Sequence, residues 1–374
     1  MIQSNEFIGK NSLANIKFII KEKKFRKVLV FAGKNSFKIS GAYERLKEIL
    51  FDIEYKIFFK TNKLPDIFDL KEFIFAINSF KPDLIIALGG GAILDLAKTS
   101  NCLFGDLNLE ENIKSSKYKI KKFCPLVAVP TTAGSGAEAT SNAVIYIDKT
   151  KYSIESSMIK PDYILIDPNL IMSTPTSVAA AAGMDAIAQA LESLISKKST
   201  PESVEFSKKS LEYLLPSFEN HINKKDFENT YRMSLGALNA GKAINISKTT
   251  APHAVSYPFT SYFGIKHGHG VALTLADFFT LNYKNLKYSK VDFDLNERFK
   301  IIFKAFEVNN VLDLEKKIKS LAKNTGLELN FNKLKITKRN QINIILENIN
   351  IQRLANNPID IGTSDIEKIL MSKI

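Results

Sequence analysis

The sequence predicts two domains, an α/β Rossmann-like domain over residues 1–173 and an all-α domain over residues 174–374. In the first half, short apolar and β-branched runs alternate with helical patterns, which is typical of a parallel sheet covered by helices. From about residue 177 onward nearly every segment has helical periodicity, which indicates a helical bundle. A chain of 374 residues is also longer than one ordinary hydrophobic core requires.

The strands expected in the first half are short apolar runs at residues 27–32, 55–60, 83–88, 126–129 and 164–166. The helical patterns between them lie at residues 42–50, 69–80 and 92–100, and residues 33–40 are expected to form a loop. Open parallel sheets bind ligands beyond the carboxyl ends of their strands. We therefore expect the segments that follow these strands to bind a cofactor.

The second half is expected to be helical throughout. The periodic segments lie at residues 178–194, 201–215, 225–240, 270–281, 312–321, 339–348 and 363–370. The boundary between the domains falls in the STPT segment at residues 173–176, where Thr176 is a suitable cap for the next helix.

Composition narrows the class of protein. The formal net charge is +13, but the lysines are scattered and no segment combines arginines with base-stacking aromatics, so we expect no nucleic-acid surface. The positive charge favours anionic small-molecule substrates instead. Two cysteines, Cys102 and Cys124, are too few for a disulfide framework, and the first residues do not resemble a secretory signal. The apolar runs are interrupted by charges and glycines, so we expect a cytoplasmic protein with no membrane partner.

A glycine-rich junction follows the third predicted strand. Gly89, Gly90 and Gly91 stand between that strand and a helix, where backbone N–H groups and the helix N-terminus can hold a pyrophosphate. The spacing is not the GxGxxG fingerprint, and a plain tight turn is the alternative. Asp95 and Lys98 lie on one face of the following helix, where they either contact the cofactor or pair with each other.

A second polar segment, PTTAGSG at residues 130–136, follows the next strand. Its hydroxyls and backbone amides, with Thr131, Thr132 and Ser135 as the named candidates, are suited to a phosphate or a nicotinamide carboxamide. Two such segments at the carboxyl ends of neighbouring strands predict a dinucleotide site more strongly than either alone.

Metal-ligand residues gather in the second half. Asp185 and Gln189 are four residues apart on a predicted helix and so point the same way. His253, His267 and His269 lie close together in the chain, in part within an HGHG segment that we expect to be a flexible turn. Asp185, Gln189, His253 and His267 together form a mixed oxygen and nitrogen donor set, which suits iron, zinc or manganese. The alternative is that Asp185 pairs locally and the histidines lie on the surface.

Four ordered motifs then give a resemblance to a known family. GGGAILDLAK at residues 89–98, PTTAGSGAEAT at 130–140, GMDAIAQALES at 183–193 and HAVSYPFTSYFGIKHG at 253–268 resemble the iron-containing (group III) alcohol dehydrogenases. The resemblance implies the two-domain architecture shared with dehydroquinate synthases. It implies metal ligands at Asp185, at the position of Gln189, and at His253 and His267. It also implies cofactor contacts from the glycine-rich segment and from the threonines and serine at 131–135.

The chain departs from the family pattern at two positions. The family usually has histidine where Gln189 and Tyr257 stand, so Tyr257 or His269 is left to relay a proton beside His267. At these two positions, and in the segments at residues 33–42 and 243–257, the chain resembles the phosphonoacetaldehyde reductases and related reductases of short aldehydes. That resemblance implies an anionic two-carbon aldehyde, and Lys248 and Thr249 are the residues placed to bind its charged group.

The segment after the first strand bears on cofactor choice. Gly33 stands where many NAD-dependent members have an aspartate, and it is followed by Lys34 and Ser36. Without a carboxylate there, a 2′-phosphate is not repelled and Lys34 is available to pair with it. This favours NADP(H), with NAD(H) as the alternative.

The function predicted from these residues is NAD(P)H-dependent, metal-assisted reduction of a small aldehyde, with phosphonoacetaldehyde as the first choice and iron or zinc as the metal. A general alcohol dehydrogenase and a sulfoacetaldehyde-type reductase are close alternatives. A dehydroquinate synthase-like lyase and a non-catalytic nucleotide-binding relative stay open as distant ones. The expected assembly is a homodimer.

Overall fold

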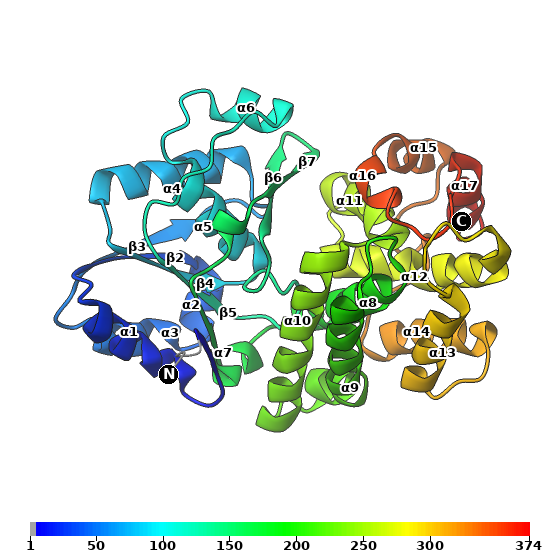
Figure 1. Ribbon diagram of the computed structural model, residues 1–374, viewed down its shortest axis with the longest axis horizontal. Coiled ribbons are helices and arrows are strands. Elements are labelled where there is room, and N and C mark those ends of the chain that lie inside the picture. The colour runs from blue at the N-terminus through cyan, green and yellow to red at the C-terminus, as the bar shows by residue number, and fades with distance from the viewer. Residues whose placement is uncertain (1–4) are drawn as a thin grey trace. The chain divides into compact units, whose positions relative to one another are not determined.

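The computed structural model describes residues 5–374, which divide into two compact units (Figure 1). The first, here called the sheet unit, holds residues 5–132 and Gly136–Thr174. The second, the helical unit, holds Pro175–Ile374 together with the three residues Ala133–Ser135. The polar segment at 130–136 is therefore shared by the two units.

Within residues 5–374 the sheet unit contains a six-stranded parallel sheet with the order β1-β8-β5-β4-β2-β3. Its strands are β1 (Glu6–Ile8), β2 (Lys27–Gly33), β3 (Glu54–Lys60), β4 (Leu84–Gly89), β5 (Leu126–Pro130) and β8 (Tyr163–Ile166). From β2 the chain moves outward to β3 and then returns to the other side of β2 as β4. The strand order therefore reverses between β2 and β4, and such a switch point is where open α/β sheets bind ligands.

Helices cover both faces of this sheet (Figure 1). Alternate residues of β2 enter two separate cores: Phe31 packs with α4 (Ile67–Phe80) and α5 (Gly91–Leu103), whereas Val30 packs with α1 (Asn15–Lys23) and α3 (Ala42–Ile49). The other elements are η1 (Ser12–Ala14), α2 (Lys34–Ile39), α6 (Leu109–Ser115), β6 (Asn142–Ile147), β7 (Thr150–Glu155), η2 (Ser157–Ile159) and α7 (Pro168–Met172). The predicted parallel α/β fold is confirmed.

One local prediction in this unit was wrong, and one element was missed. The loop expected at residues 33–40 is largely the helix α2, which is too short to show a clear apolar period. The antiparallel hairpin β6–β7 was not predicted at all. It turns at Asp148, which adopts a left-handed backbone conformation with φ of 56° and is not the Asn-Gly or Asp-Gly pair that marks such turns in a sequence.

The helical unit is built around α8 (Thr176–Ile195), which is buried along nearly its whole length and packs against α9, α10 and α12 (Figure 1). By length and hydropathy α8 would pass for a membrane span, but 89% of its apolar window is buried inside the fold, as in the core helix of a bundle. The other helices are α9 (Pro201–Asn223), α10 (Phe227–Ser247), α11 (Ala251–Phe263), α12 (His267–Lys284), η3 (Leu286–Tyr288), α13 (Leu295–Phe306), α14 (Val311–Asn324), α15 (Arg339–Glu347), α16 (Ile351–Leu354) and α17 (Thr363–Met371). The predicted helical second half is confirmed.

The start of α8 differs in detail from the prediction. Thr176 is the first residue of the helix and Pro175 is its N-cap, without a side-chain hydrogen bond. Small residues dominate α8 because its neighbours approach closely: a Cβ at Gly183 would overlap the ring of Phe218 on α9. The helix thus has little room for larger side chains on the faces that α9 and α10 cover.

Candidate metal centre

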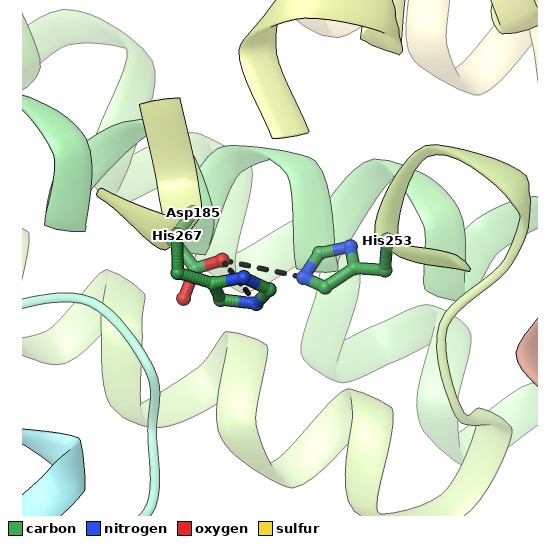
Figure 2. Close-up of side chains that lie close together, drawn as sticks. All are labelled: Asp185, His253 and His267. Atoms are coloured by element: carbon green, nitrogen blue, oxygen red, sulfur yellow. Dashed lines mark hydrogen bonds and ion pairs between the residues drawn. The ribbon is translucent and has the colours of Figure 1, made fainter. Parts of the chain in front are cut away.

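Three side chains from three helices meet inside the helical unit. The Asp185 carboxylate Oδ1 lies 3.2 Å from Nε2 of His253 and 3.8 Å from Nε2 of His267. Figure 2 shows both imidazole rings turned toward this carboxylate. Asp185 and His253 are buried, whereas 32% of the His267 side chain is exposed. The group is therefore shielded on most sides and open beside His267.

Close packing of α12 on α8 brings His267 to Asp185. A Cβ at Gly268 would overlap the carbonyl oxygen of Ala181 and lie 2.7 Å from Cβ of Asp185. Glycine at this position lets the first turn of α12 contact α8 directly. The HGHG segment is consequently helical from His267 onward, in place of the flexible turn expected from its glycines.

His253 is held from behind by a buried carboxylate that the sequence analysis missed. Nδ1 of His253 contacts Oε1 of Glu192, a residue with no exposed surface. Burial on its own would lower the pKa of His253, but the carboxylates of Glu192 and Asp185 outweigh it and raise that pKa to about 10. Without a metal, His253 is therefore protonated on both ring nitrogens, with Nδ1–H directed at Glu192 and Nε2–H directed at Asp185, and the imidazolium carries a positive charge beside Asp185.

His267, like His253, has a hydrogen-bond partner at Nδ1. Its Nδ1 lies 3.4 Å from Oγ of Ser256, and that hydroxyl donates to the carbonyl oxygen of His253 at 2.7 Å. Ser256 therefore accepts from Nδ1–H of His267, and the lone pair of the neutral ring lies on Nε2. The ring of Tyr257 stacks on the imidazole with centroids 5.6 Å apart and planes at 23°. Both histidines thus present Nε2 toward Asp185.

The geometry of these atoms fits a divalent metal. Two ligands that each lie roughly 2.1 Å from a tetrahedral metal are about 3.4 Å apart. The measured separations of 3.2 and 3.8 Å bracket that value, and the ligand atoms of all three residues lie within 4.8 Å of one another. Imidazole nitrogens with one carboxylate suit iron and zinc.

Gln189 adds a buried acceptor to this group. Its Nε2 donates to Oδ2 of Asp185 at 3.1 Å and to the carbonyl oxygen of Ser135 at 3.4 Å. No described residue donates to Oε1 of Gln189, although that oxygen is buried. An unmet buried acceptor is costly in an apolar interior, and a cation would satisfy it. This supports the fit of a metal at the site.

Two of the four histidines lie elsewhere. His269 is two residues beyond His267 on α12, which turns its side chain by about 200° around the helix. Its Nε2 contacts the carbonyl oxygen of Glu328 at 2.6 Å, and burial lowers its pKa. The structure does not bring His269 to the metal group, so Tyr257 is left as the candidate proton relay. His221 is buried between α9 and α10, where Nδ1 contacts Oγ1 of Thr230.

In the sheet unit, three predicted cofactor segments follow three adjacent strands. Gly33 ends β2 and is followed by the exposed Lys34, while Oγ of Ser36 donates back to the carbonyl of Gly33. Gly89 ends β4, and Gly91 begins α5. β5 pairs with β4 and leads directly into Thr131 and Thr132. The first two segments flank the switch point between β2 and β4.

Packing explains why glycines stand at the junction between β4 and α5. A Cβ at Gly89 would lie 2.6 Å from Cγ1 of Ile93, so only glycine lets α5 start so close to the strand. A Cβ at Gly90 would be 3.4 Å from Oγ1 of Thr132, so the two polar segments are neighbours. Thr131 is buried, and its carbonyl accepts from Thr174 at 2.7 Å. The first turn of α5 therefore begins directly at the carboxyl end of β4.

Lys98 and Asp95 have internal partners. Lys98 has no exposed side-chain surface, and its ammonium donates to Oγ1 of Thr140 and to the carbonyls of Ala137 and Asn142. Asp95 lies 3.8 Å from that ammonium and accepts from the backbone N–H of Val144 at 3.1 Å. The structure therefore gives Lys98 a structural role, in place of the predicted cofactor contact. It fixes residues 137–142 to α5.

The predicted substrate residues lie at the end of α10. Lys248 is its C-cap, partly exposed, with φ of 61° and ψ of 174°. Thr249 is buried, and its carbonyl oxygen accepts from Asn356 at 3.1 Å. Thr250 begins the link to α11, which carries His253. The segment 248–250 therefore connects directly to a metal-group histidine.

Glu192, Ser256 and Gly268 were not singled out from the sequence. Glu192 had a usable signal, because Asp185, Gln189 and Glu192 are spaced at i, i+4 and i+7 on one face of α8. Ser256 and Gly268 gave none, since their roles depend on how α11 and α12 pack.

Comparison with known proteins agrees with this architecture. The model of the iron-containing alcohol dehydrogenases matches residues 4–168, and that of the C-terminal domain of the Fe-containing alcohol dehydrogenase family matches residues 179–374. A crystal structure of sulfoacetaldehyde reductase from Bifidobacterium kashiwanohense, in complex with NAD+, is 25% identical. It has a TM-score of 0.88, and the match covers 98% of this chain and 96% of that one.

Two curated relatives match parts of the chain. The bifunctional aldehyde-alcohol dehydrogenase of Escherichia coli is 32% identical over 247 residues, which is 62% of this chain and 28% of that enzyme. The phosphonoacetaldehyde reductase of Streptomyces viridochromogenes is 27% identical over 223 residues, 55% of each chain. The matched region thus spans about half or less of each of these two relatives. The two family models cover nearly the whole chain, and we conclude that it belongs to the iron-containing alcohol dehydrogenase family.

Proposed function

We propose that this chain is an oxidoreductase that interconverts a small aldehyde and its alcohol with a nicotinamide dinucleotide and a divalent metal. The observation that carries the proposal is the convergence of Asp185, His253 and His267, with both Nε2 atoms turned toward one carboxylate oxygen. The glycine-rich start of α5 at the switch point supplies the matching dinucleotide site. Membership of the family supports the same class of reaction.

Asp185, His253 and His267 would hold the metal, with Oε1 of Gln189 as the fourth ligand. A metal bound there supplies Lewis-acid polarisation of the aldehyde oxygen, and the nicotinamide supplies the hydride. Ser256 accepts from Nδ1–H of His267 and so keeps that ring in the tautomer whose lone pair lies on Nε2. Tyr257, stacked on His267, is the proposed donor of the proton that the product oxygen takes up.

We further propose that the aldehyde has two carbons and an anionic group. The net charge of +13 favours anionic ligands, and Lys248 is a partly exposed cation in the segment that leads to His253. Phosphonoacetaldehyde is the first choice because the Streptomyces relative reduces it by name. Sulfoacetaldehyde is the second, because the NAD+-bound neighbour is a reductase of that compound. Both compounds place an anion two carbons from the reacting oxygen.

An aldehyde panel tests the reaction and its substrate. We expect metal-reloaded protein to oxidise NADPH or NADH with phosphonoacetaldehyde or sulfoacetaldehyde faster than with acetaldehyde at equal concentration. A chelator should remove the activity and added Fe(II) or Zn(II) should restore it. NADPH is the expected preference, because Lys34 is exposed after β2 and no carboxylate follows that strand to repel a 2′-phosphate.

The outcomes of the panel separate the alternatives. Absence of turnover with every short aldehyde, after either metal is added, contradicts the proposed reaction. A lyase of the dehydroquinate synthase type would convert its substrate without net consumption of NAD(P)H. Equal kcat/KM for anionic and neutral aldehydes would support the proposed reaction but contradict the proposal that the substrate is anionic.

Replacing Lys248 by alanine should weaken recognition of the anionic aldehyde alone. A charge-assisted hydrogen bond is worth about 1.5–3 kcal/mol, so its loss should raise KM for phosphonoacetaldehyde about tenfold or more. Alanine keeps a Cβ at the left-handed φ of 61°, so the backbone stays as it is. Initial-rate kinetics with both aldehydes provide the measurement.

Lys242→Ala is the matched control, because Lys242 is a partly buried lysine on the same helix whose ammonium lies over the ring of Phe206. It should leave both KM values unchanged. A similar rise of KM for acetaldehyde in Lys248→Ala would show that the lysine does not recognise the anion.

A further inference from the structure

Glu192 is a buried acid of the helical unit that lies one turn beyond Gln189 on α8 and has no exposed surface. Its Oε2 accepts from the backbone N–H of Thr250 at 2.6 Å and from the Thr250 hydroxyl at 2.9 Å. Its Oε1 contacts Nδ1 of His253. Burying a carboxylate without hydrogen-bond donors costs a large amount of free energy. The three donors directed at Glu192 therefore indicate that the fold stabilises a charged side chain at this position.

We propose that Glu192 is a positioning residue for the metal: it fixes the tautomer and the ring plane of His253 so that Nε2 is the ligand atom. An acceptor behind Nδ1 requires the proton of the neutral ring to lie on that nitrogen. In the metal-bound protein the opposite nitrogen, Nε2, then carries the lone pair; this atom lies 3.2 Å from Oδ1 of Asp185. The inference rests on the metal proposed above and adds a residue that does not touch it.

Glu192 also holds the segment from which α11 starts. Lys248 adopts a backbone conformation with φ of 61° and ψ of 174°, a region that residues other than glycine rarely occupy. Such strain persists only where surrounding contacts determine the conformation. Those contacts come from α8 and its C-cap: the C-cap Ser196 donates to the Ser247 carbonyl at 2.6 Å, and Glu192 accepts from Thr250. The carboxylate therefore sets both the start of α11 and the imidazole that it carries.

Glu192→Gln is the direct test. The amide retains the size of the side chain but presents an NH₂ group either to Thr250 or to Nδ1 of His253, so one donor loses its acceptor. We expect the affinity of metal-free protein for Zn(II) and Co(II) to fall about 10- to 100-fold, the range typical of lost partners behind metal ligands. The visible absorption of bound Co(II) should also change, because the ligand field follows the orientation of His253.

Ser193→Ala is the matched control. Ser193 is the next residue of α8, is fully buried, and accepts from the Ser247 hydroxyl at 2.8 Å, and it makes no hydrogen bond to His253. Its variant should bind Co(II) and Zn(II) as wild type does. An equal loss of affinity in both variants would overturn the proposal, because the effect would then belong to packing between α8 and residues 247–250. Unchanged affinity in Glu192→Gln would overturn it as well.

A measurement on wild-type protein tests the inference even if Glu192→Gln does not fold. In the Zn(II) form labelled with ¹⁵N-histidine, His253 should be protonated at Nδ1 and ligated through Nε2. Ligation through Nδ1 would overturn the proposal. If wild-type protein binds neither Zn(II) nor Co(II), the failure lies with the metal site itself and is distinguishable from failure of the Glu192 role.

Discussion

Asp185→Ala is expected to abolish metal binding and aldehyde reduction together. Asp185 is the carboxylate toward which both Nε2 atoms point, and it is the anionic member of the group that would balance the charge of the metal. Lewis-acid polarisation contributes several kcal/mol to such reactions, and each 1.36 kcal/mol is a factor of ten. We therefore expect kcat/KM to fall by about 1,000-fold or more.

The measurement pairs metal analysis with single-turnover rates of wild-type and variant protein after identical reloading. Asp277→Ala is the control, because Asp277 is an aspartate of the same unit that pairs with Lys319 and Lys373, outside the metal group. It should keep its metal and its rate, because neither of its ion pairs involves a residue of the metal group. Near-normal turnover in Asp185→Ala would show that the site has been assigned to the wrong residues.

Gly268→Ala should have the second largest effect, through geometry alone. The added methyl would overlap the Ala181 carbonyl and lie 2.7 Å from Cβ of Asp185, so α12 must move away from α8. His267, the preceding residue, moves with it, and the distance from its Nε2 to Asp185 increases. We expect metal affinity to fall at least tenfold and the free energy of unfolding to fall by about 1–3 kcal/mol, the usual cost of overpacking.

Metal titration and urea denaturation of the metal-free variant measure these two effects. Gly105→Ala makes the same chemical change where no atom lies within 4 Å of the new Cβ, so it should alter neither quantity. If Gly268→Ala binds metal as tightly as wild type, then contact between α12 and α8 does not position His267.

Helix phase explains why His269 does not lie beside His267 at the metal group. In a flexible turn either imidazole can reach the same point, and the two glycines of HGHG favour such a turn. The structure continues α12 through all four residues, because Gly268 packs on α8. Two residues on a helix face nearly opposite ways, so only His267 reaches Asp185.

Lys98 and Glu192 show that the sequence also does not identify the partners of buried charged side chains. The spacing of Asp95 and Lys98 is compatible with a ligand contact or an internal pair, and only the position of residues 137–142 decides between them. Glu192 shares a face of α8 with Asp185, but a glutamate on a helix is ordinarily solvated. Its role follows from Thr250 and His253, which lie 58 and 61 residues away in the chain.

The sequence by itself determined the parallel α/β first half, the helical second half, the glycine-rich start of α5 and the pairing of Asp185 with Gln189 on one helix face. These features depend on periodicity, residue type and short spacing, which are local properties. Only the tertiary structure decided how His253 and His267 are held against Asp185, because His253 lies 68 residues after it and on another helix. Where such groups meet is set by helix packing, and at this site by the absence of a side chain at Gly268.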